Sequence, residues 1–176
     1  MLKPPLPWIA RHLPLIPAAG LALDLAAGRG RHTAALRAAG LRVVAVDRDV
    51  ATLEAGFAGD LGCRIVALDL ETGAPWALGG GYDGIVVAHY LHRPLLPDLV
   101  AALAPGGALI YETFMDGNER HGKPSNPDFL LRPNELIDVF SPALTIVAFE
   151  QGLVEGPRSA VVQRLAAVKG PVGRLL

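Results

Sequence analysis

The stretch that decides the fold is Ala22-Leu23-Asp24-Leu25-Ala26-Ala27-Gly28-Arg29-Gly30. It runs from a short apolar segment into a loop with two glycines, and residues 33–39, which follow, favour a helix that Gly40 ends. A strand, a tight turn and a helix in this order predict the first unit of an α/β fold. Glycine lets the backbone of the turn approach a ligand closely, and the N–H groups at the beginning of the helix would face that ligand.

The same alternation continues along the chain. Further strands are expected over residues 42–46, 64–68, 82–88 and 108–113, with helices over 50–58 and 95–103. Strands that are apolar on both faces and alternate with helices imply a parallel sheet covered on both sides. After a helix over 132–140, the segments 144–154 and 158–168 are joined too closely to be parallel. We therefore expect an α/β, Rossmann-like three-layer sandwich with a mostly parallel, seven-stranded sheet that ends in a C-terminal antiparallel hairpin.

Length and composition restrict the class of protein. The 176 residues, 51% hydrophobic and 19% charged, predict one globular domain over residues 1–176. The formal net charge of -1 gives no electrostatic reason to expect a nucleic acid or a membrane as partner. The single cysteine, Cys63, is interpreted as a small buried hydrophobic residue, and the N-terminal residues lack the apolar run of a secretory signal. A cytoplasmic protein with a small-molecule substrate is expected, and the oligomeric state is left open.

Three aspartates follow the first three expected strands. Asp24, Asp47 and Asp69 would lie at the carboxyl edge of the sheet, where open α/β sheets bind ligands. Asp47 follows Gly28 at the distance typical of an acidic residue that accepts hydrogen bonds from ribose hydroxyls. Thr33 occupies the position where a dinucleotide site needs a third glycine. The carboxylate of Asp24 would repel a pyrophosphate but attract an ammonium or sulfonium group.

These motifs resemble those of class I S-adenosylmethionine-dependent methyltransferases. The similarity rests on 22–30 (first motif), 43–47 (second-strand motif), 67–70 (adenine segment) and 103–107 (turn before the fifth strand). Residues 90–93 and 111–114 resemble the tellurite-resistance-type branch. The resemblance implies transfer of a methyl group from S-adenosylmethionine to a small-molecule acceptor. Two alternatives remain open: an NAD(P)-dependent oxidoreductase and a noncatalytic S-adenosylmethionine-binding protein.

The resemblance also implies which residues hold the cofactor. Asp24 and the glycine loop would hold the methionine moiety, Asp47 the ribose, and Asp69 with the Leu70 backbone the adenine. The full set of expected cofactor contacts is Asp24, Ala26, Gly28, Gly30, Asp47, Arg48, Asp69, Leu70 and Ala88.

The acceptor site is expected at the loop after the fourth strand. His89 or His92 would be the general base, because histidine titrates near neutral pH. Further acceptor contacts are expected from Tyr90, as a wall of the site, and from Arg93, Glu112 and His121. The long polar loop 115–128 would lie at the same edge as a lid. No spacing of His, Cys, Asp or Glu is diagnostic of a metal site, so no metal is expected.

Overall fold

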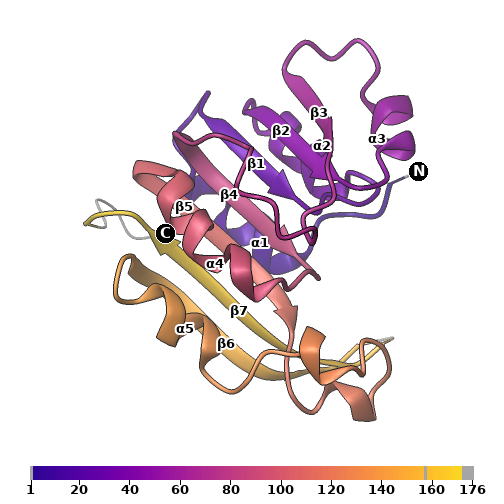
Figure 1. The fold of residues 1–176 in the computed structure, drawn as a ribbon, viewed down its shortest axis with the longest axis vertical. Helices are drawn as coiled ribbons and strands as arrows, with labels where there is room; N and C mark the ends of the chain where they lie inside the picture. Colours follow the sequence, from indigo (N-terminus) through magenta and orange to yellow (C-terminus); the bar gives the residue numbers. More distant parts are fainter. Residues whose placement is uncertain (1, 157, 172–176) are drawn as a thin grey trace.

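The computed structural model describes residues 2–156 and 158–171. These residues form a seven-stranded sheet with the order β3-β2-β1-β4-β5-β7-β6 (Figure 1). The strands are β1 (Leu21–Leu25), β2 (Arg42–Asp47), β3 (Cys63–Ala67), β4 (Tyr82–Ala88), β5 (Leu103–Phe114), β6 (Thr145–Val154) and β7 (Ala160–Val168). β1 to β5 are parallel, whereas β7 pairs antiparallel with both β5 and β6. The expected fold class is confirmed.

Helices cover both faces of this sheet. They are α1 (Pro7–His12), α2 (Arg31–Ala38), α3 (Ala51–Gly56), α4 (Leu96–Ala102) and α5 (Glu135–Phe140). Short 3-10 turns are η1 (Leu13–Leu15), η2 (Arg93–Leu95), η3 (Asn118–Arg120) and η4 (Pro127–Phe129). α4 and α5 lie in front of the sheet in Figure 1, and the buried side chains of α1, α2 and α3 belong to the core on the opposite face. The molecule therefore has the three layers that the alternation of strands and helices predicted.

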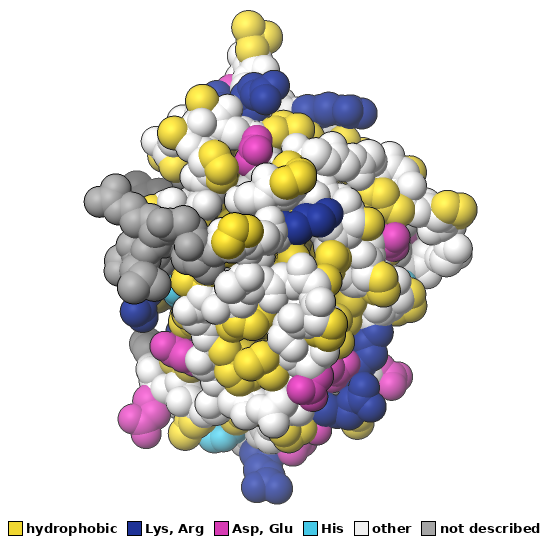
Figure 2. All heavy atoms as spheres, turned by 90° about the vertical axis from the view of Figure 1, so that its left-hand side faces the viewer, with side chains coloured by type: hydrophobic (Ala, Val, Ile, Leu, Met, Phe, Trp, Pro, Cys, Tyr) yellow, Lys and Arg dark blue, Asp and Glu magenta, His cyan; other side chains and the backbone are white. Residues whose placement is uncertain are grey.

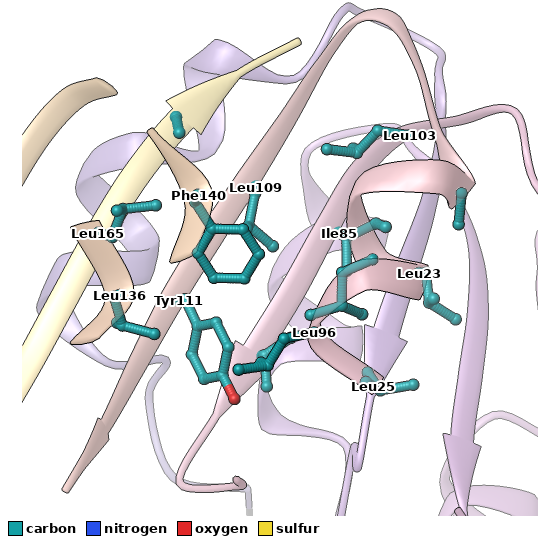
Figure 3. Packing of buried hydrophobic residues seen from close by; sticks show 14 of the residues in the cluster. Leu23, Leu25, Ile85, Leu96, Leu103, Leu109, Tyr111, Leu136, Phe140 and Leu165 are labelled. Atoms are coloured by element: carbon teal, nitrogen blue, oxygen red, sulfur yellow. The ribbon is translucent and has the colours of Figure 1, made fainter. Parts of the chain in front are cut away.

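The core under α4 and α5 positions the loop that follows β4. Leucine and isoleucine side chains of β1, β4, β5 and β7 pack there against both helices (Figure 3). Burying each such side chain stabilises the fold by about 1.5–3 kcal/mol. Tyr111 lies among them with its ring centroid 6.3 Å from that of Phe140, and its hydroxyl donates a hydrogen bond to the Tyr90 carbonyl at 2.8 Å. The buried core thus holds the backbone of the loop at Tyr90.

The opposite core ties the N-terminal helix to the C-terminal hairpin. Trp8 and Ile9 of α1 are buried with the inward side chains of β5 and β7. The indole Nε1 of Trp8 donates a hydrogen bond to the Leu165 carbonyl at 3.3 Å, so its one polar atom is satisfied. Leu36 of α2 and Leu53 of α3 complete this layer next to β1 and β2.

Two element boundaries differ by more than two residues from those expected. β5 begins at Leu103 and not at 108, because the Gly106 N–H donates to the Lys169 carbonyl at 2.7 Å and the Lys169 N–H donates to the Gly107 carbonyl at 2.9 Å. The turn expected at 103–107 is therefore hydrogen-bonded to Lys169, the residue directly after β7. α5 begins at Glu135 and not at 132, because Asn134 has a left-handed backbone (φ +63°) that does not continue a helix.

The connection from β3 to β4, residues 68–81, contains no helix. Its side-chain hydrogen bonds are local: Thr72 accepts from the Ala74 N–H at 3.3 Å, and Trp76 donates to the Gly79 carbonyl at 2.6 Å. Leu68, Leu70, Trp76 and Leu78 still pack against the core under α4 and α5. An irregular coil thus forms one side of the carboxyl edge near β3.

The surface carries mixed charge. On the face shown in Figure 2, Lys and Arg side chains are scattered among acidic and apolar ones and form no continuous basic patch over the described residues. Within those residues, no helix combines the length and the apolar character needed to cross a membrane.

Candidate functional site

A pocket of about 370 Å³ opens at the carboxyl edge of the sheet, beside the ends of β1 to β4. Its volume is within the range of about 300–1,000 Å³ that is typical of small-molecule sites. The pocket is lined by Ala26, Asp47, Arg48, Leu68, Asp69, Leu70, Glu71, His89, Tyr90 and Phe129. The chain order reverses here, with β2 and β4 on either side of β1, which is the place where open α/β sheets bind ligands.

The two glycines of the loop after β1 have different structural roles. Gly28 is exposed, has φ +56°, and a Cβ built on it would meet no atom within 4 Å, so its backbone is open to a ligand. Gly30 has φ +85°, and a Cβ there would lie 2.7 Å from a ring carbon of Phe57 and 2.8 Å from Cδ2 of Leu53. Gly30 is therefore required for the packing of the loop against α3. Only Gly28 offers the close approach that both glycines were expected to give.

The carboxylates of Asp47 and Asp69 lie in the pocket, as expected from their places after β2 and β3. Asp47 Oδ2 accepts a hydrogen bond from the Gly28 N–H at 2.8 Å and thereby joins the glycine loop to the end of β2. Asp69 Oδ1 accepts from the Glu71 N–H at 2.9 Å. A carboxylate has about four lone-pair positions, so each can accept further hydrogen bonds from hydroxyl or amino groups of a ligand.

Asp24 lies beneath the glycine loop and does not line the pocket. It is 1% exposed, and Thr33 Oγ1 donates a hydrogen bond to its Oδ2 at 2.6 Å. Burial raises the pKa of Asp24 to about 7, although Thr33 and Arg31 act in the opposite direction. Its contact with a ligand cation stays a prediction, whereas Thr33, in the place of a third glycine, has a structural role as the partner of Asp24.

His89 lines the pocket and is exposed to solvent there. Its ring centroid is 4.7 Å from that of Phe114, and its Nδ1 is 3.4 Å from Nη2 of Arg31. Desolvation by the atoms packed around it and the nearby Arg31 charge lower the pKa of His89 to about 4. General bases work best when their pKa is near the working pH, so His89 is suited to accept a hydrogen bond more than to remove a proton. His92 is half-buried before η2 and does not line the pocket.

Tyr90 forms a wall of the pocket, as its position after β4 predicted. Its hydroxyl oxygen is buried and makes no well-formed hydrogen bond to the described residues, although the carboxylate of Glu71 is close enough to interact with it. Burial, together with the nearby carboxylate of Glu71, raises the pKa of this hydroxyl, which therefore keeps its proton. A buried hydroxyl without a partner is rare in folded proteins and fits a group that is satisfied by a ligand.

The other expected acceptor residues lie outside this pocket. Arg93 is engaged with Glu135 and the loop after β5. Glu112 is 6% exposed, burial raises its pKa, and its Oε2 is 3.9 Å from Nη1 of Arg164. His121 is exposed on the loop after β5. Of the remaining expected cofactor contacts, Ala26, Arg48 and Leu70 line the pocket, and Ala88 is the half-buried last residue of β4.

Three pocket residues were absent from the expected contacts: Leu68, Glu71 and Phe129. Glu71 follows Asp69 by two residues, the spacing at which an aspartate commonly accepts a backbone N–H, so turn chemistry could have found it. Phe129 comes from η4, more than 30 residues beyond the other pocket residues, and no local pattern connects it with them. Among the described residues, no group of three or more His, Cys, Asp and Glu is arranged to hold a metal ion.

Comparison with known proteins identifies this architecture. No protein-family model matches the chain, and no curated protein matches it. Among solved structures, TehB from Haemophilus influenzae shares 18% identity and a TM-score of 0.77 over 92% of this chain, which spans only 61% of that TehB chain. The N-methyltransferase NodS from Bradyrhizobium japonicum WM9 shares 19% identity and a TM-score of 0.69, over 93% of this chain and 94% of its own.

A third match is the 1,6-didemethyltoxoflavin-N1-methyltransferase of Burkholderia thailandensis, with 22% identity and a TM-score of 0.69 over 94% of this chain and 77% of that chain. A TehB-like S-adenosylmethionine-dependent methyltransferase from Corynebacterium glutamicum also matches, at 19% identity and a TM-score of 0.66, over 92% of this chain and 87% of that chain. The chain therefore has the fold of class I S-adenosylmethionine-dependent methyltransferases, including the branch that its sequence resembles.

Proposed function

We propose that this chain binds S-adenosylmethionine in the pocket at the carboxyl edge and transfers its methyl group to a small-molecule acceptor. The observation that carries the proposal is that Asp47 and Asp69 line one pocket and that the open backbone of Gly28 is hydrogen-bonded to Asp47. Two carboxylates at successive strand ends match a ligand with a ribose and an amino-substituted ring. The structures of the Burkholderia methyltransferase and of the glycopeptide N-methyltransferase MtfA contain S-adenosylhomocysteine, which supports the same ligand here.

The residues present fit this cofactor. Asp47 would accept hydrogen bonds from the ribose hydroxyls, and Asp69 with the Leu70 backbone would bind the adenine. The unpartnered hydroxyl of Tyr90 would gain a polar partner from the ligand or the acceptor. A dinucleotide fits less well, because the position that it requires to be glycine is Thr33, which is bonded to the buried Asp24.

The chemistry asks little of the protein beyond alignment. S-adenosylmethionine supplies an electrophilic methyl group on a sulfonium, and an acceptor lone pair displaces the thioether in line. The pocket would hold the reacting groups together and exclude water. Desolvation and the Arg31 charge lower the pKa of His89 and favour its neutral form, so it would accept a hydrogen bond from the acceptor. The site therefore favours acceptors that arrive with a free lone pair, such as a soft thiolate or chalcogen anion.

Isothermal titration calorimetry with S-adenosylhomocysteine and with NADH tests the proposal directly. We expect one S-adenosylhomocysteine bound per chain and no heat of binding from NADH. Binding of NADH alone would favour the oxidoreductase alternative and overturn the proposal. Transfer of a radiolabelled methyl group to a panel of thiols, amines and chalcogen anions then tests turnover. Binding without turnover on any of them would favour the noncatalytic alternative.

A further inference from the structure

Arg93 donates hydrogen bonds from all three nitrogen atoms of its guanidinium group. Its Nε donates to Glu135 Oε1 at 2.6 Å, and its Nη2 donates to Glu135 Oε2 at 3.0 Å. Its Nη1 donates to the Asp128 carbonyl at 2.9 Å, and Nη2 also donates to the Leu130 carbonyl at 2.8 Å. A guanidinium pairs a carboxylate with two parallel hydrogen bonds, which fixes its orientation. Arg93 therefore joins three segments: the loop after β4, the loop after β5, and the first turn of α5.

The two carbonyls that Arg93 binds belong to the residues on either side of Phe129. Phe129 is 47% exposed, yet it is one of the residues that line the pocket. A large apolar side chain that is exposed at the rim of a pocket loses water when a ligand covers it. The backbone that carries this ring is held on both sides by one side chain.

The loop that carries Phe129 is fastened at further points. At its base, the Leu131 N–H donates to the Phe114 carbonyl at 3.0 Å, and the Asp116 N–H donates to the Leu131 carbonyl at 2.9 Å. Asn118 is 2% exposed, donates to the Pro124 carbonyl at 3.0 Å and accepts from the Val161 N–H at 3.1 Å. These hydrogen bonds hold the loop in place around the ring, and its role as a lid stays a prediction.

We propose that Phe129 packs on the adenosine end of the cofactor and that Arg93, held by Glu135, is the positioning residue that places this ring. The inference rests on the proposed function. Six of the ten pocket residues lie at or just after the ends of β2 and β3, at positions 47–48 and 68–71. The adenosine is proposed to bind there, and Phe129 lines the same pocket. An aromatic ring over a purine contributes stacking in addition to apolar contact.

Calorimetry of Phe129→Ala and Phe129→Leu with two probes, S-adenosylhomocysteine and 5′-methylthioadenosine, tests the role of the ring. We expect Phe129→Ala to weaken both probes by about tenfold, since both contain the adenosine. Phe129→Leu, which keeps apolar area but not the ring, should lie between wild type and alanine. Leu153→Ala, which removes an exposed apolar side chain on β6, is the control and should bind both probes like wild type. A loss limited to S-adenosylhomocysteine, or no loss, would overturn the proposal.

Arg93→Lys tests the positioning role with a conserved charge. Lysine cannot pair Glu135 and reach both carbonyls at once, so we expect Kd for both probes to rise toward the Phe129→Ala value. Combining Arg93→Lys with Phe129→Ala should then add little further loss, because both changes act on the same ring. Arg132→Lys is the matched control, since Arg132 Nε is 3.5 Å from the same Glu135 carboxylate but binds neither carbonyl.

The outcomes separate this inference from the function on which it rests. If the wild-type chain binds neither probe, the proposed function fails and this inference fails with it. If the wild-type chain binds both probes and Phe129→Ala binds them equally well, only the role of Phe129 is overturned. Should Arg93→Lys lower the unfolding midpoint without changing Kd, the arginine is structural only, and its positioning role is overturned.

Discussion

The two sides of the carboxyl edge are held by different kinds of contact. On the β1–β3 side, aspartates accept hydrogen bonds from nearby backbone: Asp47 from the Asp49 N–H at 3.1 Å and Asp69 from the Glu71 N–H at 2.9 Å. On the β4–β7 side, contacts join segments far apart in the sequence, since Arg93 binds Glu135, 42 residues away. The proposed cofactor side also has a longer contact, the Gly28 N–H bond to Asp47, but its pocket carboxylates accept from backbone N–H groups, whereas a buried side-chain ion pair joins the segments of the other side.

Two buried carboxyl groups show what this difference means for electrostatics. Asp24 on the first side has a hydroxyl partner, Thr33, and burial raises its pKa to about 7. Glu135 on the second side is also buried, but hydrogen bonds from Arg93 and the Arg132 N–H lower its pKa below its usual value despite burial. The β1–β3 side therefore contains a carboxylate that opposes folding at neutral pH, and the β4–β7 side contains one that supports it.

The largest expected effect comes from Asp24→Asn. The pKa of Asp24 is 3.8 in the unfolded chain and about 7 in the fold, so the folded state binds the extra proton between these values. The stability of the ligand-free protein should then fall as pH rises from 4 to 7, by up to about 4 kcal/mol from this group. Asp24→Asn, which can still accept from Thr33, should remove most of that slope in urea unfolding at pH 5 and pH 8. Asp69→Asn at an exposed carboxylate is the control, and an unchanged slope in Asp24→Asn would contradict the argument.

Removing Glu135 should have the next largest effect. Glu135→Ala leaves Arg93 without its carboxylate, and we expect a loss of about 2–3 kcal/mol of unfolding free energy at pH 7, because breaking a buried pair is costly. Since the folded pKa is lowered, the contribution of Glu135 is present above its unfolded pKa and is lost as pH falls through the folded one. The difference from wild type should therefore shrink in acid. Glu119→Ala, which removes the partner of the exposed Arg120, should leave the unfolding curve unchanged.

Asp47→Ala tests whether the β1–β3 side acts mainly in binding. Loss of a hydrogen bond to a charged group should weaken S-adenosylhomocysteine by about 1.5–3 kcal/mol in calorimetry. The unfolding midpoint should change little, because Asp47 is half-exposed and its internal partners are backbone N–H groups in turns. Asp49→Ala, which removes a side chain outside the pocket, is the control. Equal affinity for wild type and Asp47→Ala would refute the ribose role.

The smallest effect is expected from Arg37→Gln. Arg37 donates two hydrogen bonds to Asp60, each 2.7 Å long. The two residues are 23 positions apart in the sequence, so this is a tertiary contact on the β1–β3 side. Both side chains are partly exposed, and exposed ion pairs contribute little. We expect a smaller change in the urea midpoint than for Glu135→Ala. A larger change would show that burial does not decide the strength of these pairs.

The same contrast explains what the sequence could predict. β1 and β4 have the bounds that their apolar runs indicated, because a strand buried on both faces is a local pattern. Asp47 and Asp69 lie in the pocket because Asp47 is the last residue of β2 and Asp69 comes two residues after β3, at the carboxyl edge of a parallel sheet. The pairing of Arg93 with Glu135 was not expected, since nothing within a short window links residues 42 positions apart, and the acceptor role of Arg93 stays a prediction. Phe129 reaches the pocket for the same tertiary reason.

The rate at which a protease cleaves the coil between β3 and β4 should depend on whether the pocket holds a ligand. Residues 71–75 are exposed, and the side-chain hydrogen bonds at this coil span no more than four residues, so residues 71–75 should be a preferred site of proteolysis. Leu70 and Glu71, at its beginning, line the pocket. A ligand bound there would order the start of the coil and slow its cleavage. The rate of proteolysis would then report ligand binding without a label, an activity assay or a known acceptor.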